Sequence, residues 1–165
     1  MRVLVAVDRS EEAERALRYS CELLAGTSAW VLALHVKPNE ETITPQHFLY
    51  PTMDRIDVIE RIDSDAEQVK EGAMERCDAC SPGKVPCWAR VVAGEPAEEI
   101  LEAADMGQYD LIVLGAHGRS ALAGLLLGTI HSKILHLTRH PVLLVRESRP
   151  LRRVLVVYRG TRCDQ

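Results

Sequence analysis

The stretch Arg2-Val3-Leu4-Val5-Ala6-Val7-Asp8-Arg9-Ser10 carries the pattern on which the fold depends. Residues 2–7 form a short apolar run rich in β-branched side chains, which is typical of a strand buried on both faces of a parallel sheet. After Ser10, apolar residues recur at three- and four-residue steps until Gly26, at Ala13, Ala16, Leu17, Cys21 and Leu24. This period predicts a helix with one buried side. The stretch therefore predicts a strand followed at once by an amphipathic helix.

The same alternation of strand and helix continues through the chain. Apolar runs predict further strands at residues 30–36, 85–92, 110–114 and 141–145. Helical periods lie between them at about 54–77, 96–104 and 130–137, whereas residues 39–53 contain Pro45 and Pro51 and are expected to form a loop. Uniformly apolar strands that alternate with helices predict a parallel sheet covered on both faces, with right-handed crossovers. The predicted fold class is a doubly wound α/β domain.

Length and composition limit the class of protein. The 165 residues are enough for one domain, and 47% apolar residues exclude wholesale disorder. The net charge of −4 and the few aromatic residues (two Trp, four Tyr and one Phe) argue against a dedicated nucleic-acid binder. The longest weakly polar run, residues 121–130, is far shorter than a membrane span, and no signal-peptide core precedes Asp8. We therefore expect a cytoplasmic protein with no membrane or nucleic-acid partner.

The cysteines are Cys21, Cys77, Cys80, Cys87 and Cys163. Their odd number, in a chain long enough to fold without staples, argues against a disulfide framework. Cys77-x2-Cys80, with Cys87 further on, suggests a zinc or redox site, but a closed zinc site needs four ligands and no fourth one stands at the usual local spacing. A helix end before the turn at residues 81–83 explains these cysteines better, so no metal site is expected at them.

A glycine pattern follows the fourth predicted strand. Gly115 ends this strand, Gly118 comes next, and Gly128-Thr129 opens the last helix after a gap of nine residues. In a parallel sheet, the carboxyl ends of the strands form the edge at which ligands bind. Glycines let the main chain approach a ligand closely, and the N–H groups at a helix start attract anions. The pattern favours a phosphate cradle, although two unrelated tight turns and an ordinary helix start would give the same glycines.

Several ordered blocks of the chain resemble the universal stress protein family. The pattern Gly-x2-Gly-x9-Gly-Thr, after a strand that ends Asp-Leu-Ile-Val-Leu-Gly, resembles the ATP-binding signature of that family. Further matching blocks are Val5-Ala6-Val7-Asp8, Leu34-His35-Val36, Gly94-Glu95-Pro96-Ala97 and His140-Pro141-Val142-Leu143-Leu144-Val145. The resemblance covers most of residues 1–146 and implies a five-stranded sheet of order 3-2-1-4-5. This order would place Asp8 next to Gly115.

The resemblance also implies a site for ATP with Mg²⁺. Asp8 would accept hydrogen bonds from ribose hydroxyls or from water on the magnesium ion, and Val36 would meet the adenine edge through its backbone. The other residues that the resemblance assigns are Ala6 and Val7, at the adenine and ribose, and Gly115, His117, Gly118, Gly128, Thr129, Ile130 and His131, at the phosphates. Arg119 is the nearest fixed positive charge and would pair either with phosphate or with solvent.

Three features depart from the family pattern. Arg9 stands where a glycine is common, and His131 stands where a small hydroxyl residue is frequent, so its phosphate contact is open. Residues 147–165 have no counterpart in single-domain members, so we expect a nucleotide-binding domain at 1–146 and a C-terminal extension. Within the extension, residues 153–156 repeat the sequence of residues 2–5 and predict one extra β-strand. This strand is either a sixth strand or tail, or the opening of a lost second copy of the domain.

The resemblance implies a regulatory protein of the stress response that binds an adenine nucleotide, rather than an enzyme. The edge strand 142–145 would join two protomers into a homodimer, with residues 153–157 as a second contributing segment. A slow ATPase or phosphotransferase is the alternative, but the pattern Gly-x4-Gly-Lys-Ser/Thr is absent from the sequence. A nucleotide-free dimeric scaffold is a third interpretation. AMP or a cyclic nucleotide in place of ATP is also left open.

Overall fold

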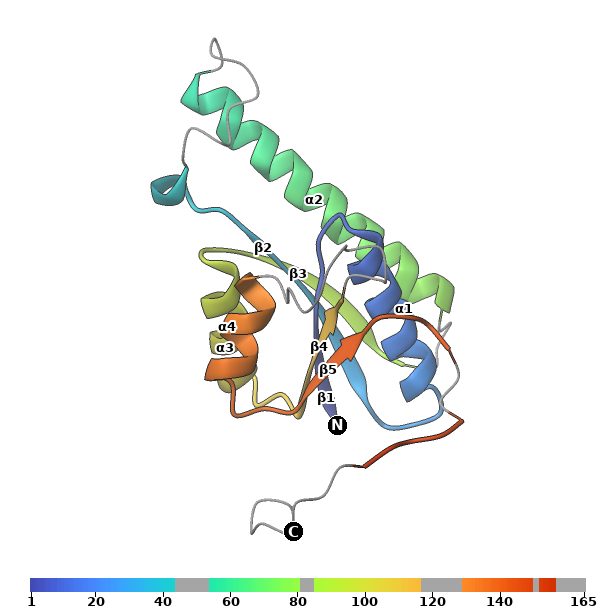
Figure 1. Cartoon of the computed structure of the whole chain (residues 1–165). Coiled ribbons are helices and arrows are strands. Elements are labelled where there is room, and N and C mark those ends of the chain that lie inside the picture. Colours follow the sequence, from blue (N-terminus) through green and yellow to red (C-terminus); the bar gives the residue numbers. More distant parts are fainter. Residues whose placement is uncertain (44–53, 81–84, 117–128, 150–151, 157–165) are drawn as a thin grey trace.

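The computed structural model describes residues 1–43, 54–80, 85–116, 129–149 and 152–156. Its strands form one five-stranded sheet, made of β1 (Arg2–Ala6), β2 (Trp30–Lys37), β3 (Cys87–Ala93), β4 (Leu111–Gly115) and β5 (Val142–Val145). All neighbouring strands are parallel and follow the order β3-β2-β1-β4-β5 (Figure 1). The predicted doubly wound sheet and its strand order are therefore confirmed.

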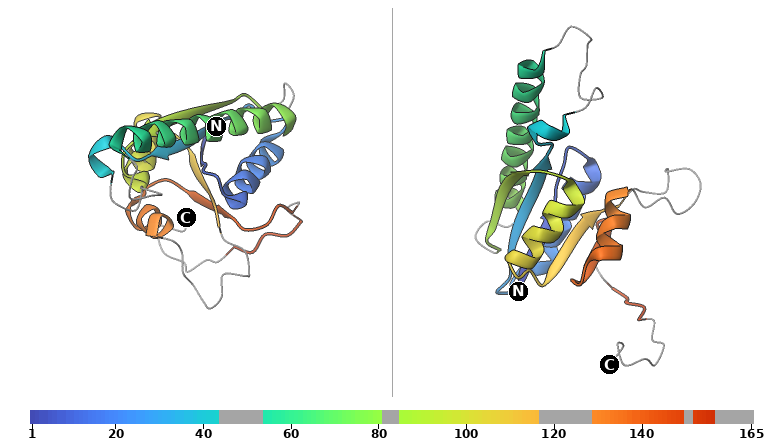
Figure 2. Two further views of the ribbon diagram at one scale, coloured as in Figure 1. Left: turned by 90° about the horizontal axis from the view of Figure 1, so that it is seen from above. Right: turned by 90° about the vertical axis from the view of Figure 1, so that its left-hand side faces the viewer.

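Helices cover both faces of the sheet, as Figure 2 shows from two further directions. The helices are α1 (Glu11–Leu24), α2 (Arg55–Cys80), α3 (Pro96–Met106) and α4 (Thr129–Leu137), and a short 3-10 helix, η1 (Glu40–Thr42), follows β2. α1 and α2 lie on one face, and α3 and α4 lie on the other. None of the helices among the described residues is long and apolar enough to span a membrane.

The side chains of β1 alternate between two hydrophobic cores. Val3 and Val5, both 0% exposed, belong to the core beneath α1 and α2. Leu4, also 0% exposed, belongs to the core beneath α3 and α4, and Ala6 packs against the same core. Because successive side chains of a strand point to opposite faces, one continuous apolar run supplies both cores.

A capping residue stands immediately before α1 on one face of the sheet and before α3 on the other. Ser10 Oγ accepts a hydrogen bond from Ala13 N at 3.1 Å and so caps α1, where the sequence predicts the helix to begin. The Glu95 carboxylate caps α3 by accepting a hydrogen bond from Glu98 N at 3.0 Å. Pro96 occupies the start of α3, where the N–H that proline lacks would have no partner within the helix. These caps fix the points at which the chain turns from the sheet into each helix.

The described part of the C-terminal extension does not form the predicted extra β-strand. Residues 152–156 form no strand, and Val157, the last residue of the predicted segment, lies outside the described residues. Val154, Leu155 and Val156 are 74%, 89% and 78% exposed. Figure 1 shows this segment outside the sheet, and among the described residues it pairs with no strand. An apolar, β-branched sequence supplies the tendency to form a strand but not the partner.

A disulfide joins two of the cysteines, which contradicts the expectation that they are unpaired. It links Cys77, near the end of α2, to Cys87, the first residue of β3. Their Cα atoms are 5.8 Å apart, a separation common among native disulfides. The start of β3 lies beside the end of α2, because Cys87 packs against the core to which Cys77 belongs. The two cysteines therefore meet although they do not follow the Cys-x2-Cys spacing.

Candidate functional site

A cavity of about 260 Å³ lies at the edge of the sheet where β1, β2 and β4 end. The first turn of α1 and the starts of α3 and α4 complete its walls. The lining residues are Ala6, Val7, Asp8, Ser10, Glu12, Ala13, Leu34, His35, Val36, Pro96, Ile100, Leu114, Gly115, Ile130 and His131. This is the edge at which open parallel sheets bind ligands, because the strand order reverses there between β1 and β4.

The cavity gathers most of the described residues that the sequence predicts for the site. Ala6, Val7, Asp8, Val36, Gly115, Ile130 and His131 all line it. Thr129 is the first residue of α4 and is exposed, and it is not among the lining residues. His117, Gly118, Arg119 and Gly128 lie outside the described residues. Segments from both halves of the chain thus meet at one place.

The lining combines apolar side chains with polar ones. Leu34, Ile100 and Leu114 are core residues, at most 3% exposed, and they form part of the wall. Polar groups are contributed mainly by loops and helix starts, among them Asp8 and His131. Sites for small molecules commonly have this composition, with an apolar surface for a ring and a few polar groups that fix its orientation.

Asp8 is held at the entrance to α1. Its Oδ1 atom accepts a hydrogen bond from Ser10 N at 2.8 Å and another from the Ser10 hydroxyl. A short polar side chain that bonds the backbone two residues ahead makes an Asx turn, which fixes the carboxylate in place. These bonds use part of the accepting capacity of the two oxygens. The remainder suits hydroxyl donors or a hard cation.

His35, near the end of β2, is a cavity residue outside the set that the sequence predicts for ligand binding. Its Nδ1 lies 2.9 Å from the carbonyl oxygen of Val7, and because a carbonyl only accepts, Nδ1 is the donor. The ring therefore joins the ends of β1 and β2. In the neutral ring with this tautomer, Nε2 is an acceptor. The sequence signal for His35 is its place immediately before Val36, at the carboxyl end of an apolar run.

Gly115 is required by the packing of α1 against β4. A Cβ atom at this position would lie 2.4 Å from the carbonyl carbon and oxygen of Glu12 and 2.7 Å from Ala13 N. These neighbours are backbone atoms of a helix, which cannot rotate aside. The sequence predicts that Gly115 allows a close approach to a ligand. The structure shows that the closest approach is to the first turn of α1.

His131 contacts the end of β4. Its Nε2 lies 2.7 Å from the carbonyl oxygen of Gly115, so Nε2 donates this hydrogen bond. The predicted phosphate contact cannot use that nitrogen at the same time. Nδ1 donates to an anion only when the ring carries both protons. In the structure, His131 therefore connects the start of α4 to the end of β4.

Two ion pairs lie near the cavity. Lys133 Nζ lies 3.1 Å from Glu95 Oε1 and so joins α4 to the start of α3. Burial raises the pKa of Glu95, but the hydrogen bonds from Lys133 and from the main chain outweigh it and hold this pKa below its ordinary value. Arg9 turns toward α2, where its Nη2 lies 2.5 Å from Asp65 Oδ1. In the part of the chain that the structure describes, no Lys or Arg lines the cavity.

Comparison with known proteins gives consistent matches over most of the chain. The family model described as "Universal stress protein family" matches residues 1–146. Universal stress protein YxiE of Bacillus subtilis is 30% identical over 154 residues, which cover 88% of this chain and 98% of YxiE. Universal stress protein Rv2005c of Mycobacterium tuberculosis is 28% identical over 146 residues, which cover 88% of this chain but 45% of that protein. The chain thus spans less than half the length of this relative.

A solved structure shows the same fold. The structure of protein MJ0577, a universal stress protein of Methanocaldococcus jannaschii, is 25% identical to this chain. It superimposes with a TM-score of 0.68 over 90% of this chain and 96% of that chain. The strand order, the family model that covers residues 1–146, and the similarity to YxiE over nearly its whole length agree. The chain belongs to the universal stress protein family.

Proposed function

We propose that this protein binds an adenine nucleotide, ATP with Mg²⁺, in the cavity at the ends of β1, β2 and β4, and that it is a regulatory protein of the stress response. The observation that carries the proposal is the meeting of Ala6, Asp8, Val36, Gly115 and His131 around one cavity. The family resemblance assigns these same residues to the adenine, ribose and phosphates. They come from different elements of the chain, so their convergence does not follow from sequence spacing alone.

The cavity suits the separate parts of such a ligand. The apolar side chains of Leu34, Val36 and Ile100 offer a surface for an adenine ring. The phosphates would lie toward the start of α4, where main-chain N–H groups and the helix dipole favour anions. The Asp8 carboxylate would accept from the ribose hydroxyls or bind Mg²⁺, directly or through water. Mg²⁺ prefers oxygen ligands and is usually held by one or two carboxylates together with substrate phosphates.

Three proteins with the same fold support the choice of ligand class. One universal stress protein has been solved in complex with cAMP, that of Archaeoglobus fulgidus in complex with dAMP, and an Arabidopsis thaliana member with AMP bound. Adenine and at least one phosphate are common to all three ligands. This shared chemistry supports an adenine nucleotide here.

Titration calorimetry with ATP, AMP and cAMP, together with a phosphate-release assay, tests the proposal. We expect ATP to bind, to bind more weakly without Mg²⁺, and not to be turned over. Efficient phosphoryl transfer needs a cationic clamp, and the described lining of the cavity contains no Lys or Arg. GTP is the matched control, because it carries the same phosphates on a different base. If none of the adenine nucleotides binds, the proposal is contradicted. ATP hydrolysis at about 1 s⁻¹ would contradict the regulatory role.

We further propose that two copies of the chain associate through the edge of the sheet at β5. Among the described residues β5 is the last strand of the sheet, so its outer side offers main-chain groups to a further strand. The exposed apolar segment Val154–Val156 belongs to the same C-terminal part of the chain. A second copy is the partner that we propose, because each copy carries both the open edge and the segment. Such matching surfaces suit a symmetric dimer.

Deleting residues 150–165 should weaken this dimer. The deletion removes Val154, Leu155 and Val156, each at least 74% exposed in a single chain, and apolar surface of this kind is stabilised by burial between copies. Light scattering across a concentration series measures the change as a shift toward the monomer mass. A full-length variant with serine at all three positions is the matched control and should shift in the same direction. Unchanged mass and stability in both variants would show that the extension makes no contribution.

A further inference from the structure

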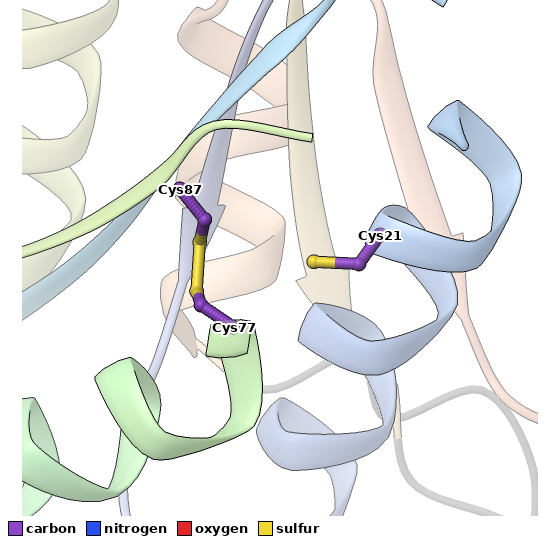
Figure 3. Close-up of side chains that lie close together, drawn as sticks. All are labelled: Cys21, Cys77 and Cys87. Atoms are coloured by element: carbon purple, nitrogen blue, oxygen red, sulfur yellow. A yellow bond between two sulfur atoms is a disulfide. The ribbon is translucent and has the colours of Figure 1, made fainter. Parts of the chain in front are cut away.

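Three cysteine sulfurs meet beneath α1 and α2 (Figure 3). Cys21 comes from α1, Cys77 from α2 and Cys87 from the start of β3, and all three sulfur atoms lie within 4.8 Å of one another. Cys77 and Cys87 form the disulfide, and Figure 3 shows the Cys21 side chain directed toward it. Elements distant in the sequence thus bring three sulfurs into reach of one another.

This cysteine cluster lies at the opposite end of the sheet from the cavity. Cys87 is in register with Val31, at the start of β2, whereas the cavity residues His35 and Val36 lie near the end of that strand. None of the three cysteines lines the cavity. The cluster is therefore a second site, and the proposed nucleotide binding does not account for it.

The surroundings of the cluster favour a disulfide over a metal ion. Cys21 and Cys77 belong to the hydrophobic core that also contains Leu24 and Val85, and Cys87 packs against this core. A structural zinc site is usually completed by four ligands, and its cysteines bind as thiolates. Three thiolates would bring charge into an apolar core, whereas a disulfide and a thiol are both neutral.

The three cysteine residues differ in their exposure to solvent. Cys21 is 0% exposed and Cys77 is 3% exposed, whereas Cys87 is only partly buried. Thiol–disulfide exchange proceeds by attack of a thiolate on a sulfur atom that it can reach. A small external reagent therefore reaches Cys87 first. Cys77, already within bonding distance of Cys87, is the residue placed to complete the exchange.

We propose that Cys77 and Cys87 are a reversible thiol–disulfide pair, a modification site that responds to low-molecular-weight disulfides such as oxidised glutathione. In the oxidation, the Cys87 thiolate attacks one sulfur of the external disulfide and releases the first small thiol. The Cys77 thiolate then attacks the Cys87 sulfur and releases the second. Two cysteine thiols become one disulfide, and one external disulfide becomes two thiols, which carry the two protons that the cysteines lose. Reduction is the reverse sequence.

The bridge ties the end of α2 to the start of β3, across a sequence separation of 10 residues. Closing a loop restricts the unfolded chain, and this stabilises the folded protein relative to its reduced form. For a loop and a chain of this size we expect the melting temperature to fall by roughly 5–10 °C on reduction. The fall should be reversed when the protein is reoxidised.

The test uses the full chain with Cys80→Ser and Cys163→Ser, so that Cys21, Cys77 and Cys87 are the only cysteines. The protein is equilibrated with reduced or oxidised glutathione and unfolded, and its thiols are counted. All three thiols should be found after reduction and only that of Cys21 after oxidation, and the change should be reversible. Peptide mapping should find Cys77 linked to Cys87. A thiol count that is the same in both buffers, or a bridge that contains Cys21, overturns the proposal.

Single variants in the same background test the roles of the cysteines. Cys77→Ser should trap one glutathione on Cys87, whereas Cys87→Ser should leave the buried Cys77 without one, because only Cys87 is partly accessible. Cys21→Ser is the matched control and should retain the reversible bridge and its effect on the melting temperature. A zinc or copper ion that copurifies with the reduced protein and is lost in Cys21→Ser would overturn the proposal, because the cluster would then be a thiolate metal site.

Discussion

Gly115→Ala should destabilise the protein by about 3 kcal/mol, although it adds only one methyl group. The new Cβ atom would lie 2.4 Å from backbone atoms of Glu12, which is too close for any real contact. Because these atoms belong to the first turn of α1, relief requires the helix to move away from β4. If the Gly115 backbone shifts instead, the hydrogen bond of 2.7 Å between His131 and the Gly115 carbonyl is disturbed. Thermal unfolding should show a melting temperature lower by about 6–12 °C.

Gly72→Ala is the matched control for this variant. A Cβ atom at Gly72 would approach Arg76 Nη1 at 3.0 Å, the end of a flexible side chain that can shift. Gly72 lies inside α2, where alanine is favoured over glycine by about 1 kcal/mol. We expect this variant to be as stable as the natural protein or slightly more stable. Equal losses in the two variants would contradict the explanation by backbone contact.

Ala6→Phe should weaken ATP binding at least about a hundredfold, or about 2.7 kcal/mol. Ala6 is the last residue of β1 and lines the cavity of about 260 Å³. A benzyl group there would occupy the space that the proposed adenine and ribose need. Because Ala6 is only partly buried and borders the cavity, the larger side chain can extend into the cavity. Titration calorimetry measures the loss of affinity.

Ala6→Ser is the control for the loss of binding, because it changes the same position with little change in size. It should bind ATP with nearly natural affinity. The melting temperature of both variants must be measured, so that a loss of binding is not confused with a loss of fold. If a folded Ala6→Phe variant binds ATP as tightly as the natural chain, the nucleotide does not occupy this cavity.

The sheet and its order are predictable because each strand carries its own pattern and the resemblance supplies the order. The apolar run before Asp8 and the cap at Ser10 set the first strand and helix, and both are present in the structure. The bounds differ slightly, since β1 ends at Ala6 instead of Val7 and β3 begins at Cys87 instead of Val85. Strand ends depend on the hydrogen bonds of the ladder, which side-chain patterns do not encode.

The candidate site is only partly predictable, because much of it depends on contacts between distant segments. Asp8 and Gly115 stand at strand ends and carry a motif, whereas Glu12 and His35 line the cavity without one. A sequence can show that a glycine follows a strand but not which backbone it faces. The contact of Gly115 with α1 therefore emerges only from the structure.

The cysteines show the same limit of sequence patterns. The spacing of Cys77 and Cys80 suggests a local pair, yet the partner of Cys77 is Cys87. The third sulfur, that of Cys21, comes from another helix. Only the packing of α1 and α2 on one face of the sheet brings these residues together.

The alternation of side chains along β1 limits how this part of the protein can change in length. Val5 belongs to the core beneath α1 and α2, whereas Ala6 faces the other side and borders the cavity. Insertion or deletion of one residue within the strand would exchange these faces, because the period of a strand is two. A valine would then narrow the cavity while an alanine left a void beneath α1. A single substitution in β1 acts on one face of the sheet, whereas a change of length there alters stability and ligand binding together.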